Sequence, residues 1–322
     1  MAVPVAWKNH SIHRRVEELA ARSFETPPGG TAFYVWSAYG DDDADGLTPG
    51  TALDTVKAAY AKCTAEKHDV VYLIAGDTSD QPTTAITWAK DHTHLIGLGA
   101  DFPGIGCRSQ IVGTAANAIG VGGVLIISAR GCIVKNIQIQ NATAAASGGT
   151  VVSGPYNYFE GVYFNGINDA TAGAAATSFC LSVTGAENYF KRCTIGSVQT
   201  ILASTNSVLL ISNGANTFDG CRIQHYSQTT GNFLVQLVAG TGGLSLILFK
   251  DCIFYNQTVN WAAGSTDIFN VAHTGSHYVL LKDCTAIGGT GAGISWADVV
   301  THVYHDKPAP ATGGGIAIAV NA

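Results

Sequence analysis

Residues 249–254 read Phe-Lys-Asp-Cys-Ile-Phe, and this short pattern decides the fold because it recurs along the chain. Each copy has a large apolar residue, two polar or small residues, a small apolar anchor and one variable residue. In five of the six copies a second large apolar residue follows. The copies lie at 134–139, 159–164, 190–195, 218–223, 249–254 and 281–286. Successive anchors are 25 to 32 residues apart, so the period is near 30 residues.

Each copy indicates two β-strands joined by a bend. The anchor and the residue two places later alternate with polar neighbours, as one face of a strand does. The two polar positions before the anchor mark the bend. Further apolar strands are expected at 123–127, 179–183, 207–211, 233–238 and 267–271. Two or three strands per turn of this length predict a parallel β-helix, whereas a propeller would need longer, four-stranded repeats.

Four anchors are cysteines, namely Cys193, Cys221, Cys252 and Cys284. In a parallel β-helix they would form a ladder of thiols inside the coil, about 4.8 Å apart. The chain has eight cysteines but no C-x-x-C pair that would indicate a structural zinc site. The first residues also lack the pattern of a secretory signal, so reduced thiols in a cytosol are expected. A disulfide between adjacent rungs is the alternative that the geometry allows.

The composition limits the classes of partner. Charged residues make up 12% of the chain, about half the usual share, and apolar residues 47%. No apolar stretch approaches the length of a transmembrane helix, so none is expected. The net charge is −6, and the basic residues are scattered. This pattern argues against nucleic acid or an anionic membrane as the main partner and favours protein or glycan.

A capping helix is predicted ahead of the repeats. Leu53, Val56, Tyr60 and Cys63 follow helical spacing and would share one face of a helix from about 53 to 65. Asp54 or Thr51 would stand near its start. That face should cover the first rung of the coil, because an open coil end exposes unpaired backbone and apolar interior. Early strands are expected to follow at 69–76, 86–88, 94–99 and 110–112.

The N-terminal region also carries a family resemblance. The strand 33–35, the Asp-rich segment 40–49, the helix at 53–61 and the strand 69–73 with Gly76 resemble the start of pectin-lyase-like right-handed β-helix proteins. With the repeated bends, the resemblance covers roughly residues 33–290 and implies a right-handed solenoid with a helical cap. Members of that superfamily include polysaccharide lyases, glycoside hydrolases and phage virion proteins such as tailspikes and head decoration proteins. The resemblance therefore implies the fold more than an activity.

We expect an all-β chain, a right-handed single-stranded parallel β-helix, in four parts. These are an N-terminal arm with a short helix (1–32), a strand with the Asp-rich turn and capping helix (33–68), the β-helix (69–290) and a C-terminal tail that makes the oligomer contact (291–322). The arm carries an apolar stripe at Ile12, Val16, Leu19 and Ala20. It is either a docking arm or a helix packed on the flank of the coil. In the tail, 313–320 reads as an edge strand that awaits a partner.

Acidic residues at the bends are the candidates for catalysis. In the superfamily that the chain resembles, lyases need carboxylates that hold calcium and a basic residue as proton acceptor, and hydrolases need two or three carboxylates clustered on neighbouring rungs. Asp219, Asp251 and Asp283 occupy bends, with Asp219 offset by one residue from the other two. Asp251 and Asp283 should stack about 4.8 Å apart, flanked by Lys250 and Lys282. A solvated charge ladder is the favoured interpretation, and a catalytic pair is the alternative.

The Asp-rich segment is a candidate metal site. Asp41, Asp43, Asp45 and Gly46 match the start of a calcium loop, but the twelfth position is Ala52 instead of a bidentate acid. A turn whose carboxylates cap backbone amides is therefore favoured, with calcium binding as the alternative.

Histidines and tyrosines give two further hypotheses. His92 and His94 would share one face of a strand, and His302 and His305 are three apart. No third ligand is evident nearby, so these are interpreted as surface histidines. The tyrosines form either a glycan-stacking strip or part of the strand packing; they are Tyr156, Tyr158, Tyr163 and Tyr189.

Together these features predict a non-enzymatic bacteriophage virion protein, a head decoration or cement protein on the capsid surface, assembled in the host cytoplasm. Its expected partner is the major capsid protein, and a host surface glycan is a further candidate. The resemblance implies a homotrimer. We assign no catalytic residue, cofactor or metal, and neither nucleic acid nor membrane as partner. The alternatives are a tailspike-type polysaccharide lyase or hydrolase and a glycan-binding module without turnover.

Overall fold

The structure is a computed structural model. It describes residues 29–76, 78–99, 109–114, 122–144, 148–202, 207–227, 232–238, 245–258, 267–271, 277–288, 295–297 and 303–306. The predicted helix of the N-terminal arm and the predicted edge strand at 313–320 lie outside these residues, as does His302. Within the ranges just given, the structure has no helix that is both long and apolar enough to span a membrane.

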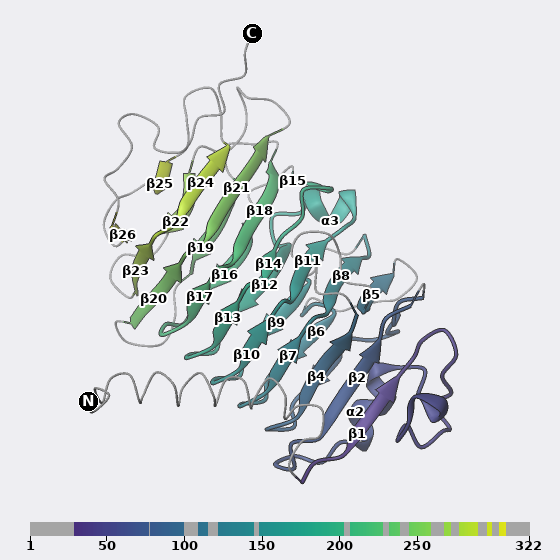
Figure 1. The fold of residues 1–322 in the computed structure, drawn as a ribbon. Helices are drawn as coiled ribbons and strands as arrows, with labels where there is room; N and C mark the ends of the chain where they lie inside the picture. The colour runs from purple at the N-terminus through teal and green to yellow at the C-terminus, as the bar shows by residue number, and fades with distance from the viewer. Residues whose placement is uncertain are drawn as a thin grey trace, which may run out of the picture.

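The chain winds into three parallel sheets, which we call A, B and C. Within each sheet the strands lie side by side in order from the N-terminal to the C-terminal end of the coil (Figure 1). Sheet A has the order β1 (Ala32–Val35), β2 (Val70–Ile74), β4 (His94–Leu98), β7 (Ile133–Lys135), β10 (Tyr158–Glu160), β13 (Tyr189–Lys191), β17 (Thr217–Asp219), β20 (Ser245–Lys250), β23 (His277–Lys282) and β26 (Val303–His305).

Sheet B has the order β5 (Gln110–Thr114), β8 (Gln138–Ala142), β11 (Tyr163–Ile167), β14 (Thr194–Ile195), β18 (Arg222–Ser227), β21 (Ile253–Thr258) and β24 (Thr285–Gly288), with β15 (Ile201–Leu202) also paired to β18. Sheet C has the order β3 (Ile86–Trp88), β6 (Leu125–Ile127), β9 (Thr150–Val152), β12 (Phe179–Val183), β16 (Ser207–Ile211), β19 (Phe233–Leu237), β22 (Asp267–Val271) and β25 (Ser295–Ala297).

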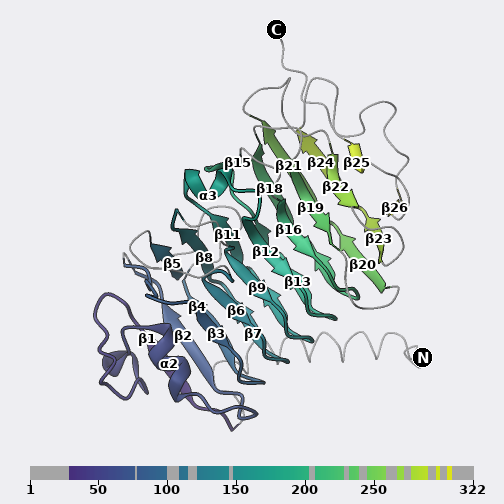
Figure 2. The same ribbon diagram turned by 180° about the vertical axis from the view of Figure 1, so that it is seen from behind.

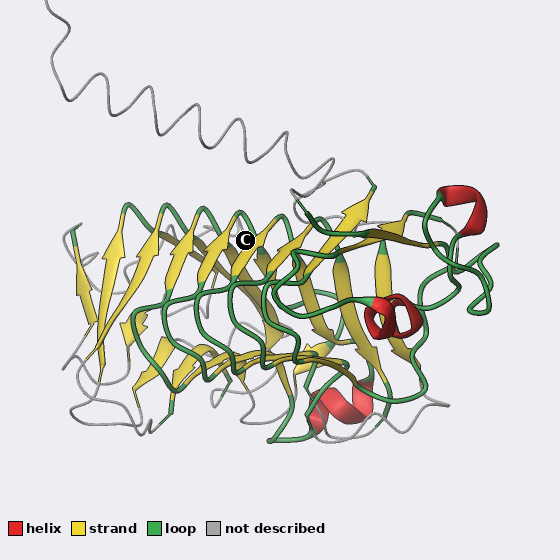
Figure 3. Cartoon of the chain, turned by 90° about the horizontal axis from the view of Figure 1, so that it is seen from below, coloured by secondary structure: helices red, strands yellow, loops and turns green. Residues whose placement is uncertain are grey.

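From β4 onward the chain visits the sheets in the order A, B, C, so each turn adds one strand to each sheet. Seen from below, neighbouring rungs repeat this path with loops at the corners (Figure 3). The architecture is the predicted right-handed parallel β-helix. The strand predictions at 179–183, 207–211 and 267–271 match β12, β16 and β22. The period of the sequence pattern is therefore one turn of the coil.

The predicted bends are the corners between sheets A and B. Their first residues pair in register from Val134 through Phe159, Phe190, Phe218 and Phe249 to Leu281. At each corner, the residue before the anchor has a left-handed backbone, with φ between 51° and 63°. These residues are Asn136, Gly161, Arg192, Gly220, Asp251 and Asp283. The left-handed turn explains why Asn, Asp or Gly stands at five of these six positions, Arg192 being the exception.

Aromatic rings and thiols stack in the interior behind these corners. The rings of Phe159, Phe190, Phe218 and Phe249 lie face to face, with centroids 4.6–4.7 Å apart and interplanar angles of 6–10°. Each later cysteine donates from its Sγ to the carbonyl oxygen of a phenylalanine one rung earlier, at 3.3–3.4 Å. These pairs are Cys221 with Phe190, Cys252 with Phe218 and Cys284 with Phe249.

The predicted thiol ladder is confirmed, because the four anchor cysteines are at most 5% exposed and lie on successive rungs. The seven cysteines of the described residues are free. Burial raises the pKa of the Cys180 thiol to about 12 and that of Cys132 to about 11. These thiols stay protonated at neutral pH and contribute as small apolar groups.

An asparagine ladder at the corner between sheets C and A was not predicted. Asn157, Asn188 and Asn216 are at most 1% exposed. The Oδ1 of Asn216 accepts from the backbone N–H of Asn188, and the Oδ1 of Asn188 accepts from that of Asn157, both at 2.9 Å. The sequence does contain a signal for this ladder, because an asparagine stands two residues before the corner phenylalanine in three successive repeats. This ladder satisfies backbone donors that the turn would otherwise leave unpaired.

The cap is shorter than predicted. Helix α2 spans Val56–Lys62, and the Thr55 side chain accepts from the backbone N–H of Ala58, so Thr55 is the N-cap instead of Asp54 or Thr51. A short 3₁₀-helix, η1 (Pro49–Thr51), precedes it, and Leu53 is in an isolated bridge to Val35. Figure 2 shows α2 beside β3, at the N-terminal edge of sheet C.

Two contacts bind α2 to this edge. The ring of Tyr60 stacks on Trp88 at 4.2 Å, and the Lys90 ammonium donates to three carbonyls at the end of the helix. The predicted role of the helix as a cover for the first coil edge agrees with this packing.

The structure differs from the predicted fold in three further elements. The three-residue strand β9 was not predicted. A short helix, α3 (Ala170–Ala174), follows β11, and the Asp169 side chain caps it. Strands β25 and β26 continue sheets C and A beyond the expected boundary of the coil at residue 290.

The left-handed corners predict a specific glycine effect. A Cβ at Gly220 would meet only the Cγ of Arg192, at 3.6 Å, so Gly220→Ala changes the backbone preference without a steric clash. We expect a loss of about 1–2 kcal/mol in the free energy of unfolding, measured by denaturant titration. Gly50→Ala is the matched control, because a Cβ there would meet only the Oγ1 of Thr48, at 3.8 Å, and Gly50 has no positive φ. Equal stability of the two variants would contradict the role assigned to the corner.

The ring stack gives a second prediction. Phe218 is fully buried between Phe190 and Phe249, so Phe218→Ala should lower the free energy of unfolding by about 3–5 kcal/mol. Leu47→Ala, at a loop residue that is 49% exposed, should change it by less than about 0.5 kcal/mol. A small effect at Phe218 would mean that the stack does not stabilise the coil.

Candidate functional site

The outer face of sheet A carries two parallel rows of side chains. The uncharged row consists of Ile133, Tyr158, Tyr189, Thr217, Leu248, Leu280 and Tyr304. The charged row lies two residues further along each strand and consists of Lys135, Glu160, Lys191, Asp219, Lys250 and Lys282. Both rows face outward because the residues between them are the buried corner residues. Sheet A therefore presents an apolar stripe beside a stripe of mostly alternating charge.

Ion pairs bind the charged row across the rungs. Glu160 lies 3.0 Å from the Nζ of Lys135, 2.5 Å from the Nη2 of Arg192 and 4.0 Å from the Nζ of Lys191. Burial raises the pKa of Glu160, but the bonds to Lys135 and Arg192 outweigh burial and hold that pKa below its usual value. Asp219 accepts from the Tyr189 hydroxyl at 2.6 Å and lies 3.6 Å from the Nζ of Lys250. These carboxylates are engaged with neighbouring side chains.

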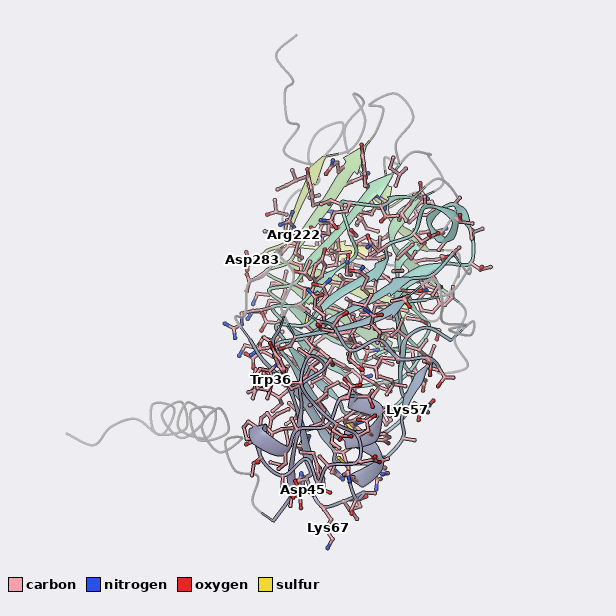
Figure 4. All side chains as sticks on the ribbon, turned by 90° about the vertical axis from the view of Figure 1, so that its right-hand side faces the viewer. Trp36, Asp45, Lys57, Lys67, Arg222 and Asp283 are labelled. Carbon is pink, nitrogen blue, oxygen red and sulfur yellow. The ribbon has the colours of Figure 1, made fainter. Side chains whose placement is uncertain are left out.

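The two candidate catalytic carboxylates lie on adjacent rungs at exposed corners. Asp251 donates its backbone N–H to the carbonyl of Lys282, and its carboxylate lies 3.6 Å from the Nζ of Lys250. Asp283 donates its backbone N–H to the carboxylate of Asp306, and Figure 4 shows Asp283 at the outer surface of the solenoid. The predicted offset is present, because Asp219 pairs in register with Lys250. This arrangement is a solvated charge ladder at a bend.

The Asp-rich turn uses its carboxylates on its own backbone. The Oδ1 of Asp41 accepts from the N–H of Asp43. The Oδ1 of Asp45 accepts from the Thr51 hydroxyl and the N–H of Leu47, and these two bonds lower the pKa of Asp45. Among the residues described here, no group of three or more His, Cys, Asp or Glu side chains is arranged to hold a metal ion. The geometry is that of the capping turn that the sequence favoured over a calcium loop.

Asp42, for which no role was predicted from the sequence, fixes the start of the capping helix. Its Oδ1 accepts from the backbone N–H of Asp54 and of Thr55, and its Oδ2 accepts from the Thr55 hydroxyl, all at 2.9 Å. The turn is therefore tied to the N-cap of α2.

The interpretation of surface histidines is wrong for His94, which is 1% exposed. A third histidine, His68, lies beside it, with its Nδ1 3.2 Å from the Nε2 of His94. The N–H of Ile133 donates to the Nδ1 of His94, so both ring nitrogens are in use. Burial and the neighbouring His68 lower the pKa of His94 to about 4. His68 was missed because it lies 26 positions earlier, on the preceding rung, and only the coil brings it close.

The four candidate tyrosines do not form one strip. Tyr163 is on sheet B and is partly buried, whereas Tyr158 and Tyr189 are neighbours in the uncharged row of sheet A. The rings of Tyr158 and Tyr189 stack with centroids 5.9 Å apart, and the Lys135 ammonium covers Tyr158 at 5.5 Å. Tyr156 is 58% exposed at the corner between sheets C and A. Three of the four are thus gathered at one edge of sheet A.

Two buried titratable groups were also missed. Burial, reinforced by the charges of Asp54 and Asp42, raises the pKa of Asp80 to about 7. His225 is fully buried, with its Nε2 2.6 Å from the Oδ1 of Asn256. Burial lowers the pKa of His225 to about 4. The sequence gives no sign of either, because their burial follows from the packing of rungs.

Known proteins match this chain in structure. No protein-family model matches it, and no curated protein matches its sequence. The pectin methylesterase PemA of Erwinia chrysanthemi superposes with a TM-score of 0.51, at 13% identity over 87% of this chain and 81% of the enzyme. A pectin methylesterase solved in complex with a hexasaccharide gives a TM-score of 0.50, at 14% identity over 85% and 80% of the two chains.

A viral protein also matches. ORF18 of Geobacillus virus E2 aligns with 86% of this chain and 65% of its own, at 16% identity and a TM-score of 0.25, which is too low to carry an argument. The two superpositions on pectin methylesterases show that the protein has the pectin-lyase-like right-handed parallel β-helix fold. At these identities the likeness concerns the fold alone.

The raised pKa of Asp80 predicts a pH-dependent stability. Between the ordinary carboxyl pKa and about 7, the folded state keeps a proton that the unfolded chain has lost. The free energy of unfolding should therefore fall as the pH rises through this window. Asp80→Asn removes the effect, so the variant should gain roughly 2–4 kcal/mol over wild type at pH 8 and nothing at pH 4.

Denaturant titrations at the two pH values measure this difference. Asp43→Asn is the control, because Asp43 is an exposed residue of the Asp-rich turn and should have little effect at either pH. A gain for Asp80→Asn that is the same at both pH values would show that ionisation of Asp80 is not its source.

Proposed function

We propose that the protein is a structural protein of a bacteriophage virion, a head decoration protein that binds the major capsid protein and stabilises the shell. The observation that carries this proposal is the use of the acidic side chains near the sheet A corners. Glu160, Asp219 and Asp251 lie in ion pairs with basic side chains of the same or neighbouring rungs. Such pairing suits a rigid scaffold, whereas a general acid needs a carboxyl group that is available to substrate.

The interior supports the same role. Stacked phenylalanines, hydrogen-bonded thiols and the asparagine ladder join each rung to the next, so the coil forms a continuous packed rod. Buried thiols with raised pKa suit a protein assembled in the reducing cytoplasm of the host. In this proposal the solenoid projects from the capsid surface and acts as a homo-oligomer, for which the fold resemblance suggests three copies.

Binding to capsids is the direct test. We expect the full-length protein to co-sediment with tail-free capsids of the phage whose genome encodes it and to raise the temperature at which they disrupt. An excess of untagged protein should displace a tagged copy, which controls for non-specific pelleting. Protein that stays in the supernatant, with capsid stability unchanged, would overturn the proposal.

A polysaccharide-active enzyme of tailspike type is the second candidate, favoured by the fold shared with pectin methylesterases. If the proposed function is correct, host polysaccharides and methylated pectin should release no reducing ends, unsaturated sugars or methanol. If turnover occurs and is lost in Asp251→Ala and in Asp283→Ala, the charge ladder is a catalytic pair. Turnover that survives both substitutions would place the chemistry elsewhere. Glycan binding without turnover would favour a binding module instead.

A further inference from the structure

The uncharged row of sheet A runs along most of the coil. Over seven successive strands, from Ile133 to Tyr304, this row contains no Asp, Glu, Lys or Arg. The charged row lies on one side. On the other side, the residues two places earlier are Gly131, Tyr156, Glu187, Ala215, Leu246 and Tyr278, and of these six only Glu187 is charged. Tyr189 and Tyr304 are 36% and 53% exposed, and the other members of the row are partly exposed. An uncharged surface of this length is a candidate interaction surface.

Tyr156 adds an independent observation. It is 58% exposed, and its φ of 61° places it in the left-handed region. The equivalent position one rung earlier is Gly131, with φ 66°, which the same backbone accommodates without strain. A tyrosine there costs about 1–2 kcal/mol that a glycine would not. The next two rungs carry Glu187 and Ala215 at this position, also with positive φ, so the corner accepts residues other than glycine. Tyrosine is among the residues that most often dominate binding energy at interfaces, and Tyr156 lies exposed beside the uncharged row.

The stacking of the tyrosines favours a protein partner over a sugar. A sugar ring packs against the open face of an aromatic ring. Here Tyr158 lies between the Lys135 ammonium and Tyr189, and the hydroxyl of Tyr189 donates to Asp219. The rings therefore turn their edges outward, and these edges with the neighbouring Leu248 and Leu280 form a surface suited to apolar packing.

We infer that copies of this chain associate side by side through the outer face of sheet A, with their coils parallel and equal rungs level. Around a symmetry axis parallel to the coil, each residue of the uncharged row meets the same residue of the other copies. A charged row at that axis would bring like charges together, which is destabilising. The uncharged row satisfies that condition.

On the rung of Tyr189 the flanking residues complement one another in this arrangement. Lys191 and Glu187 stand on opposite sides of Tyr189 on the same rung. In a level, cyclic assembly the Lys191 edge of one copy lies against the Glu187 edge of the next, so opposite charges meet.

The area of this face can be compared with that of known interfaces. The uncharged row spans seven strands, about 29 Å at about 4.8 Å per rung, so a strip roughly 15 Å wide covers roughly 430 Å² per copy. A standard interface buries about 800 Å² per partner, so this strip supplies about half of that area, and the exposed corner residue Tyr156 adds to it. This inference deepens the proposed function, because it names the face through which the homo-oligomer forms.

The test compares one substitution on sheet A with a matched one on sheet B. Tyr189→Lys places a charge at the centre of the uncharged row. Ile253→Lys places the same charge on the outer face of sheet B, at a residue that is 43% exposed. Light scattering after size-exclusion chromatography of the full chain should show an oligomer for wild type and for Ile253→Lys. For Tyr189→Lys it should show a monomer, or a dissociation constant raised at least tenfold.

A monomeric wild type, or an oligomer that Tyr189→Lys leaves unchanged, would overturn the inference. So would an equal loss of association in both variants. Failure to bind capsids by a chain that remains oligomeric would count against the proposed function alone.

A second measurement does not depend on the folding of Tyr189→Lys. Thr217 lies in the uncharged row, so a cysteine placed there should face its own copy across the axis. Thr217→Cys should form an intermolecular disulfide under mild oxidation, and Ile253→Cys should not. The other cysteines of the described chain are buried and free, which keeps the background low. Absence of this cross-link in an oligomeric Thr217→Cys protein would contradict the level, parallel arrangement.

Discussion

The structure depends on the alignment of equivalent residues between successive rungs. Because the corner phenylalanines pair in register, their rings stack and each thiol reaches a carbonyl one rung away. The asparagine ladder fixes the next corner in the same way. A one-residue slip would turn the buried face of a strand outward, so these contacts specify one register for the whole coil. The rest of the architecture follows from this alignment.

The same alignment arranges the surface. Once the interior residues are stacked, the residues between them must form rows along the coil. On sheet A one row is apolar and its neighbour carries mostly alternating charges that form ion pairs across rungs. A function that acts along the length of the solenoid therefore depends on rows of equivalent surface residues. Association between level copies and attachment to a lattice of capsid subunits are both functions of this kind.

Much of the fold follows from the sequence, because one local pattern recurs at one period. The corners, most strands and the thiol ladder were predicted from apolar spacing alone. The predicted start of the capping helix was wrong, because Leu53 continues the helical spacing in the sequence but forms a β-bridge with Val35 in the structure. The proximity of His68 to His94 and the burial of Asp80 could not be predicted, since each depends on how neighbouring rungs and the cap pack. By contrast, the one-residue offset of Asp219 from Asp251 and Asp283 was predicted from the repeat.

The position of the sulfur atoms tests the central claim of a coil with residues stacked in register. A crystal of the protein measured at a wavelength where sulfur scatters anomalously would locate these atoms without reference to any structure. The account predicts that Cys193, Cys221, Cys252 and Cys284 give a row of peaks about 4.8 Å apart. Peaks scattered through the molecule, or separated by distances unrelated to the rung spacing, would contradict it.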